Sequence, residues 1–237
     1  MILNSSKIKF SRADLNKKLI LPERITPELA EETGLHIGDG SMNFYFNKGY
    51  YVGKYSLRGH ISDDIEHYDI RIKKLYHMLY NFNPNLKTMK STGVYGFQLW
   101  TDCIVAFKNK ILTLPLGNKK NIKIPHCLVI KKEYIVSVLR GIFDTDGCIY
   151  LEPKNHRLYP RVQIGTTSRI LAEQLKKNLF RLGFRVTKFM ENREHKGWNN
   201  LYIISVRGDK MLRKWMEVIE PRNPKYISKF EYYLKNS

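Results

Sequence analysis

A stretch near residue 30 places apolar side chains at helical spacing and ends in Asp-Gly. In TPELAEETGLHIGDG (residues 26–40), Leu29, Thr33 and Ile37 recur every four residues, which predicts a helix with one buried face. Thr26 is a suitable N-cap, and a proline follows it at the first helical position. The helix is therefore expected to begin after Thr26 and to end at the Asp-Gly pair.

A second stretch repeats this pattern in the other half of the chain. In KKEYIVSVLRGIFDTDG (residues 131–147), one helical face carries Tyr134, Val138 and Gly141 or Ile142, after a polar start. When the two stretches are aligned on Gly40 and Gly147, matching positions lie 107 residues apart. An internal duplication is the simplest interpretation.

The residues after each Asp-Gly pair also match in kind. Both halves continue with two alternating, strand-like segments, a long amphipathic segment, further strand-like segments and another amphipathic segment. In the first half these include residues 41–46, 50–59, 63–82 and 94–101, and in the second half residues 148–152, 158–167, 169–184 and 200–208. Each half therefore predicts an αββαββα unit, which makes the fold class α+β. We expect a basic N-terminal segment (1–25), a first repeat (26–127) and a second repeat (128–237).

Small residues upstream of each Asp-Gly pair give the two helices a reason to pack together. Gly34 and Gly38 are four residues apart, as are Gly141 and Thr145, so each helix has a face that another backbone can approach closely. If the helices pack side by side, their C-terminal ends meet.

The aspartates that end the two helices, Asp39 and Asp146, would then converge. Two carboxylates at the negative ends of two helix dipoles repel each other unless a cation lies between them. Hard divalent ions prefer oxygen ligands of this kind. The sequence therefore predicts a Mg²⁺ site formed by Asp39 and Asp146.

The stretch DTDG (residues 144–147) has competing interpretations. Asp144 could be a phosphatase nucleophile at the end of a buried strand. That fold needs a parallel βαβ alternation, which this chain does not show. The other repeat also has Ile37 at the equivalent position. A calcium loop would need Glu where Asn155 stands. In the helix-pair interpretation, Asp144 makes local hydrogen bonds at the helix end.

Charge indicates the class of partner. The chain of 237 residues contains 41 Lys and Arg against 22 Asp and Glu, a formal net charge of +19. Such an excess favours a polyanionic partner, above all a nucleic acid. A membrane is not expected, because no apolar stretch approaches the roughly 20 residues that a spanning helix needs. The absence of a signal-peptide pattern and of paired cysteines predicts an intracellular protein, cytoplasmic in a prokaryote or else organellar.

Together these features resemble the monomeric two-motif LAGLIDADG homing endonucleases. ETGLHIGDG and LRGIFDTDG are the two motif copies, and the resemblance covers roughly residues 26–235, with the linker LPLGNKKNIKIP and the late PRNPKYISKFEYYL. The resemblance implies two pseudo-twofold related, saddle-shaped antiparallel sheets along the DNA major groove, with paired central helices over the minor groove. It also implies a metal site that involves Asp39, Asp146, Gly38 and Thr145.

The strand-like segments themselves carry residues suited to DNA. Basic and amide side chains alternate with tyrosines, as in a ribbon that lays one face in a major groove. The DNA-binding candidates are Lys48, Lys54, Tyr55, Arg58, Lys154, Arg157, Arg161, Gln163, Arg193 and Arg207. A strand of about nine residues spans ~30 Å, so two halves follow roughly 18 bp of double-stranded DNA. Since the halves differ at almost every strand position, the target is expected to be asymmetric.

The resemblance further implies side chains around an attacking water at the sheet edges. By rough alignment these are His60 or Arg58 in the first half, and Thr166 and Arg207 in the second. His36 lies inside a motif helix, and a core histidine is the simpler interpretation. We expect Mg²⁺ as cofactor, Mn²⁺ as a substitute, and Ca²⁺ to bind without supporting cleavage.

Other functions remain open on sequence alone. A splicing maturase or a DNA-binding regulator of the same fold would keep the basic sheets, and an RNA-binding ribosomal-type protein would explain the charge but not the paired acidic motifs. The presence of both Asp39 and Asp146 favours a competent, monomeric endonuclease.

Overall fold

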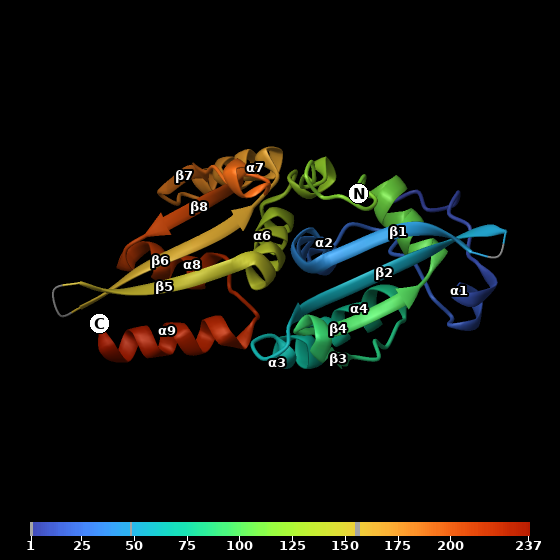
Figure 1. Cartoon of the computed structure of the whole chain (residues 1–237), viewed down its shortest axis with the longest axis horizontal. Helices are drawn as coiled ribbons and strands as arrows, with labels where there is room; N and C mark the ends of the chain where they lie inside the picture. Colours follow the sequence, from blue (N-terminus) through green and yellow to red (C-terminus); the bar gives the residue numbers. More distant parts are fainter. Residues whose placement is uncertain (1, 48, 155–156) are drawn as a thin grey trace.

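The computed structural model describes residues 2–47, 49–154 and 157–237. Its two halves lie side by side, each built on a four-stranded antiparallel sheet (Figure 1). The strand order is β1-β2-β4-β3 in one sheet and β5-β6-β8-β7 in the other, so each strand has its duplicate at the same place. The predicted α+β fold with duplicated αββαββα units is confirmed.

The elements of the first half follow the predicted order. Its strands are β1 (Gly40–Asn47), β2 (Tyr50–His60), β3 (Lys87–Met89) and β4 (Val94–Trp100). Its helices are α2 (Pro27–Asp39), α3 (Ile65–His67), a π-helical turn (Tyr68–Ile72), α4 (Lys73–Tyr80), α5 (Asp102–Ala106) and a second π-helical turn (Phe107–Ile111), with a short 3₁₀ turn at Lys90–Thr92. The long amphipathic segment expected at 63–82 is thus one nearly continuous helical stretch. It ends where Asn81 adopts a left-handed conformation (φ 51°).

The second half repeats the order. Its strands are β5 (Gly147–Lys154), β6 (Arg157–Thr166), β7 (Val186–Glu191) and β8 (Leu201–Arg207). Its helices are α6 (Lys132–Asp146), α7 (Arg169–Arg181) and α8 (Asp209–Val218), with 3₁₀ turns at His126–Leu128 and Glu194–Lys196. A further helix, α9 (Pro224–Asn236), has no counterpart among the described residues of the first half and runs beside β5 (Figure 1).

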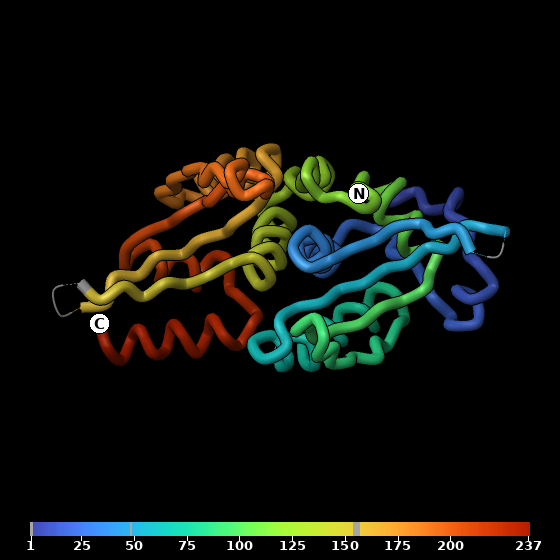
Figure 2. Tube along the Cα trace, viewed as in Figure 1, coloured from blue at the N-terminus to red at the C-terminus, as the bar shows by residue number. Residues whose placement is uncertain are grey.

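The motif helices α2 and α6 pack against each other at the junction of the halves (Figure 2). Thr26 caps α2 as expected, because its hydroxyl accepts a hydrogen bond from the backbone N–H of Leu29 at 3.2 Å. Gly34 and Gly141 allow the close approach: a Cβ at Gly34 would lie 2.3 Å from the carbonyl oxygen of Val138. The backbones of the two helices are therefore in contact, as the small residues predict.

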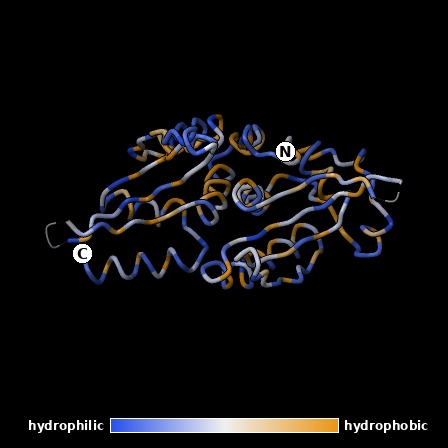
Figure 3. Tube along the Cα trace, in the orientation of Figure 1, coloured by the Kyte–Doolittle hydropathy of each residue, from blue (hydrophilic) through white to orange (hydrophobic). Residues whose placement is uncertain are grey.

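Apolar and polar positions alternate along the strands (Figure 3), which leaves each sheet one buried and one exposed face. In β6, Pro160, Val162 and Ile164 are buried, whereas Arg157 and Tyr159 are exposed. The helices α7 and α8 pack against the second sheet and contribute Leu175, Leu212 and Trp215 to its core. The opposite, more polar face of each sheet is the surface on which the predicted DNA-binding residues have to lie.

The N-terminal segment packs onto the first half. It contributes Leu3, Ile8, Leu19 and Ile25 to the core. Its short helix α1 (Arg12–Asn16) is capped by Ser11. Within the described residues, none of the helices is long and apolar enough to cross a membrane.

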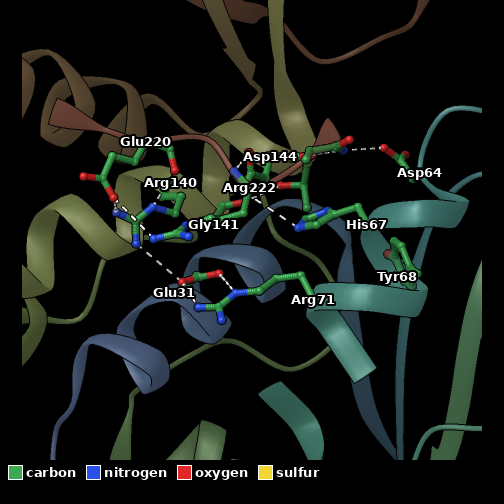
Figure 4. A network of polar contacts seen from close by, with 12 residues as sticks. Glu31, Asp64, His67, Tyr68, Arg71, Arg140, Gly141, Asp144, Glu220 and Arg222 are labelled. Atoms are coloured by element: carbon green, nitrogen blue, oxygen red, sulfur yellow. Dashed lines mark hydrogen bonds and ion pairs between the residues drawn. The ribbon is translucent and has the colours of Figure 1, made fainter. Parts of the chain in front are cut away.

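Polar contacts join the halves beside the motif helices (Figure 4). Glu31 of α2 accepts two hydrogen bonds from Arg71, at 2.7 and 2.6 Å, and lies 3.5 Å from Arg140 of α6. Asp64, after β2, accepts hydrogen bonds from Asn223 at 2.8 Å and from Lys225 at 2.7 Å. These contacts fix the loop after β2 against the start of α9.

Candidate active site and nucleic-acid interface

The C-terminal ends of α2 and α6 bring Asp39 and Asp146 together. At this level the helices touch, because a Cβ at Gly38 would lie 1.9 Å from Thr145 Oγ1 and 3.4 Å from Asp146 Cγ. The Asp39 side chain is half-buried and accepts a hydrogen bond from the Tyr68 hydroxyl at 3.2 Å. Asp146 is exposed at the same surface. The carboxylate pair expected from the duplication is therefore present.

The pair is electrostatically unfavourable without a cation. Burial, followed by repulsion from Asp146 and Asp64, raises the pKa of Asp39 to about 7. Burial also raises the pKa of Asp146 to about 6, against the opposing attraction of Lys119 and Lys225. Because Asp146 is exposed, solvent screens part of this effect. Two hard oxygen donors held in this way suit a divalent cation such as Mg²⁺. Among the described residues no cluster of three His, Cys, Asp or Glu accompanies them.

Asp144, two residues before Asp146, has a structural role. Its side chain is only 1% exposed and accepts hydrogen bonds from the backbone N–H of Arg222 at 3.2 and 2.9 Å (Figure 4). The Asn223 side chain donates to the Asp144 carbonyl oxygen at 3.0 Å. Asp144 faces the interior rather than the carboxylate pair, as the helix-pair interpretation predicts.

The exposed faces of the two sheets carry matching rows of polar side chains. In the first sheet Asn43, Lys54 and Trp100 lie opposite one another across β1, β2 and β4. The Lys54 ammonium lies 5.5 Å from the Trp100 ring centre. Arg58, farther along β2, donates to Gln98 at 2.9 Å.

The second sheet has the equivalent row. Tyr150, Arg161 and Arg207 lie opposite one another across β5, β6 and β8. The Arg161 guanidinium lies 5.1 Å from the Tyr150 ring centre and pairs with Glu152. Both rows place cations beside aromatic rings on an open surface, which suits contact with nucleic-acid backbone and bases.

Comparison with known proteins identifies this arrangement. A family model described as a LAGLIDADG-like domain matches residues 133–220, most of the second half. Variants of the homing endonuclease I-DmoI align with a TM-score of 0.59 over 83% of this chain and 97% of theirs, at 15% identity. I-LtrWI, a LAGLIDADG homing endonuclease bound to target DNA, aligns with a TM-score of 0.55 over 88% and 89%, at 13% identity. The second half therefore contains a LAGLIDADG-like domain, and the whole chain has the fold of these homing endonucleases.

One curated protein also matches this chain. The glutamine–fructose-6-phosphate aminotransferase (isomerizing) of Methanocaldococcus jannaschii is 24% identical over 200 residues, which are 84% of this chain and 16% of that protein. This chain therefore spans about a sixth of the length of that relative.

Several expected site residues differ from their predicted placement. Tyr55, expected to contact DNA, is fully buried, and its hydroxyl lies 2.5 Å from that of Tyr76. Thr166 has the parity of the buried Val162 and Ile164, and its hydroxyl accepts a hydrogen bond from Ser168 N at 3.1 Å. Because that hydroxyl caps the turn before α7, it is poorly placed to orient an attacking water.

Arg207 also lies away from the carboxylates. Arg207 of β8 is paired with Arg161 of β6. Gly147, which follows Asp146, is paired with Ile164, three residues farther along β6. At ~3.3 Å per residue this places Arg207 about 10 Å from the level of Asp146. The position suits a DNA contact better than catalysis.

The remaining candidates lie at or near the exposed faces. His60 is exposed, with Nδ1 3.0 Å from the Ser62 hydroxyl, and Arg157 is exposed at the outer end of β6. Gln163 is half-buried beside Cys148, and Arg193 donates to Glu191 at 2.8 Å. Lys48 lies outside the described residues, and of Lys154 only the backbone is described.

Predicted metal ligands other than the aspartates are already engaged. The Thr145 hydroxyl donates to the carbonyls of Gly141 and Ile142, both at 3.0 Å. The Gly38 carbonyl accepts a hydrogen bond from Lys119. Sequence reasoning missed this lysine, and the only signal was its place in the linker between the repeats. His36 is a core residue, as expected, stacked on Tyr55.

Proposed function

We propose that this protein is a site-specific homing endonuclease that cuts both strands of double-stranded DNA. Asp39 and Asp146 hold the divalent cation, and the exposed faces of the two sheets bind the duplex on either side of it. The protein acts as a monomer, because one chain supplies both carboxylates.

One observation carries the proposal: two carboxylates with raised pKa values meet at the junction of two cation-bearing sheets. Two helices can end side by side without a pair of carboxylates. The repulsion between the two carboxylates lowers stability unless a bound ligand compensates for it. Perturbed carboxylates on a surface between two binding faces are typical of a catalytic centre.

The residues have separable tasks. The Tyr68 hydroxyl orients Asp39, and the close contact between Gly38 and Thr145 sets the spacing of the two helix ends. A bound divalent cation supplies charge stabilisation at the scissile phosphate and a lower pKa for an attacking water. Mg²⁺ is the proposed cofactor, with Mn²⁺ as a substitute, while Ca²⁺ binds without supporting cleavage.

The fold neighbours support a DNA substrate and divalent ions. I-DmoI has been solved in complex with DNA and Ca. That structure aligns with this chain with a TM-score of 0.61 and 14% identity, over 86% of this chain and 97% of that one. The same protein has been solved in complex with DNA and Mn. In this chain the rows through Lys54 and Arg161 lie on corresponding strands of the two sheets. An asymmetric target of roughly 18 bp follows from strand length and the differences between the halves.

Incubation with a plasmid library of random inserts tests the proposal. We expect linear products in Mg²⁺ or Mn²⁺, none in EDTA, and a single asymmetric sequence around the sequenced ends. Binding without cleavage in every divalent ion would instead indicate a DNA-binding regulator, and a palindromic optimum would contradict the unequal roles of the two halves.

RNA binding of the maturase kind is a second candidate. The observation in its favour is a group of exposed aromatic side chains at the outer end of the first sheet. The group consists of Tyr45, Phe46, Tyr50, Tyr51 and Trp100. Unpaired bases stack on such rings. Tighter binding to structured RNA than to duplex DNA at equal salt would favour this function.

A further inference from the structure

The linker between the halves is anchored on both sides of Lys119. On one side, the backbone N–H of Gly117 donates to the Met42 carbonyl of β1 at 2.9 Å. On the other, the Ser168 hydroxyl donates to the Ile122 carbonyl at 2.7 Å, and the Ile122 side chain is buried. The linker thus crosses the junction at a fixed place, and Lys119 is presented from it toward the end of α2.

The Lys119 ammonium binds the end of helix α2. It donates to the carbonyl oxygen of Ile37 at 3.0 Å and also to that of Gly38. The last carbonyls of a helix lack intrahelical donors and form its negative pole, so a cation is favoured there. The half-buried Lys119 therefore has two backbone partners, which a freely solvated lysine would not have.

The same ammonium lies near the carboxylate pair, because its hydrogen-bond partner Gly38 directly precedes Asp39 at the end of α2. Burial lowers the pKa of Lys119, whereas Asp146 and then Asp39 oppose that change. Lys119 correspondingly opposes the rise in the pKa of each aspartate. Its charge thus partly compensates the two carboxylates from the adjacent helix end.

Neighbouring lysines are not equivalent. Lys120 is exposed, and its backbone N–H is bound to the Asn118 side chain. Lys225 also opposes the rise in the pKa of Asp146, but its ammonium donates to Asp64 at 2.7 Å. Among the lysines that the structure describes, Lys119 is the one whose ammonium donates to backbone carbonyls of a motif helix.

We propose that Lys119 is a tethered cation that lies next to the Asp39–Asp146 site in the metal-free protein and competes electrostatically with the divalent ion. The proposal rests on the metal site of the proposed function. A divalent ion binds the two carboxylates fully only when the Lys119 ammonium moves away, because two cations at one anionic site repel each other. Lys119 thereby lowers the affinity for metal and stabilises the junction of the halves in its absence.

Two variants separate the charge of Lys119 from its hydrogen bonds. Lys119→Met removes both the charge and the donor, whereas Lys119→Gln removes the charge and keeps a donor for the carbonyls of α2. Lys120→Met is the matched control, because it makes the same change in net charge at the adjacent, exposed position. Asp39→Asn/Asp146→Asn removes the carboxylate pair.

Mn²⁺ binding to the DNA-free protein, followed by electron paramagnetic resonance and calorimetry, provides the test. We expect Lys119→Met and Lys119→Gln to bind Mn²⁺ roughly 5- to 150-fold more tightly than the wild type, the usual range for coupling between two ligands. Lys120→Met should bind like the wild type. Thermal unfolding in EDTA should occur at a lower temperature for Lys119→Met, and Mn²⁺ should raise it more than it raises that of the wild type.

The outcomes distinguish the two proposals. If the double aspartate variant loses Mn²⁺ binding while both Lys119 variants bind like the wild type or more weakly, the metal site stands and the competing role of Lys119 is wrong. If neither the wild type nor the Lys119 variants bind Mn²⁺, both proposals are wrong. If Lys119→Met does not fold, Lys119→Gln alone decides between these results.

Discussion

Gly34 of α2 and Gly141 of α6 face each other where the motif helices cross, with no room for a side chain on either. A Cβ at Gly141 would lie 2.2 Å from the carbonyl oxygen of Glu31 and 2.7 Å from the backbone nitrogen of Leu35. The obstacles are backbone atoms, so the clash is relieved only if the helices separate. This contact sets how far apart the two aspartates lie.

Gly141→Ala is therefore expected to destabilise the protein although alanine favours helices. The propensity gain is ~1 kcal/mol, whereas overpacking against backbone costs roughly 1–3 kcal/mol or more. Urea unfolding should show a lower midpoint than for the wild type. Gly165→Ala is the control, because its nearest neighbour, Leu201, would lie at an ordinary 3.5 Å. Equal midpoints for the two variants would contradict the close crossing.

Breaking a buried ion pair is expected to destabilise the first half strongly. Lys108 and Glu32 are both fully buried, with two N–O distances of 2.6 Å, and Tyr76 and Tyr80 also donate to Glu32. Glu32→Gln leaves the ammonium unpaired in the core and should cost about 3–5 kcal/mol of unfolding free energy.

The control for this pair is Glu133→Gln, which breaks the exposed contact with Lys131. Its unfolding curve in urea should coincide with that of the wild type. A Glu32→Gln variant as stable as Glu133→Gln would show that the buried charges are dispensable.

His67 is expected to make stability fall on acidification. Burial lowers its pKa from 6.5 to about 4, against the opposing attraction of Asp64, and its Nε2 lies 3.8 Å from Asp144 Oδ2. The unfolded chain binds a proton on the His67 imidazole more tightly than the folded chain does. The contribution of uncharged His67 to stability is therefore complete above pH 6.5 and is lost as the pH falls toward 4. Each pH unit in that window corresponds to roughly 1.4 kcal/mol.

His67→Gln should accordingly reduce the difference in unfolding free energy between pH 7 and pH 5, measured by urea titration. His60→Gln changes an exposed histidine and should leave that difference unaltered. A pH dependence that is the same in all three proteins would refute the burial of an uncharged His67.

Affinity for duplex DNA is expected to fall steeply with salt. If about 6 to 10 phosphates are neutralised by the two sheet faces, log affinity against log salt should have a slope of roughly −5 to −9. Fluorescence anisotropy between 50 and 300 mM salt measures it, and replacing Lys54 or Arg161 should make the slope shallower by about 1. A slope near zero would rule out a nucleic-acid partner.

Much of the fold could be predicted because its determinants are local. The cap at Thr26, the small residues at Gly34 and Gly141 and the alternation along each strand all depend on near neighbours in sequence. Because the two repeats have the same order, Asp39 and Asp146 occupy equivalent positions and could be predicted to form a pair. Asp144 could be distinguished from Asp146 because Ile37 occupies the equivalent position in the other repeat.

The errors and omissions arose where placement depends on distant parts of the chain. Arg207 and Thr166 are positioned by strand register, which a rough alignment does not determine. Lys119 is positioned by a linker anchored to both halves, and no spacing in the sequence encodes that path. Tyr55 is different: its parity, one residue from both Lys54 and Ser56, already placed it on the buried face.

The most direct test of the account measures DNA binding and single-turnover cleavage separately for Asp146→Asn and Asp144→Asn on a selected target. Asp146→Asn should bind about as well as the wild type, since it removes a negative charge near phosphates, but should cleave at least roughly 10² to 10³ times more slowly. Asp144→Asn should cleave at close to the wild-type rate while losing about 1–3 kcal/mol of stability, because it disturbs the hydrogen bonds from Arg222. Near wild-type double-strand cleavage by Asp146→Asn, or a loss of cleavage confined to a folded Asp144→Asn, would contradict the assignment of the carboxylate pair.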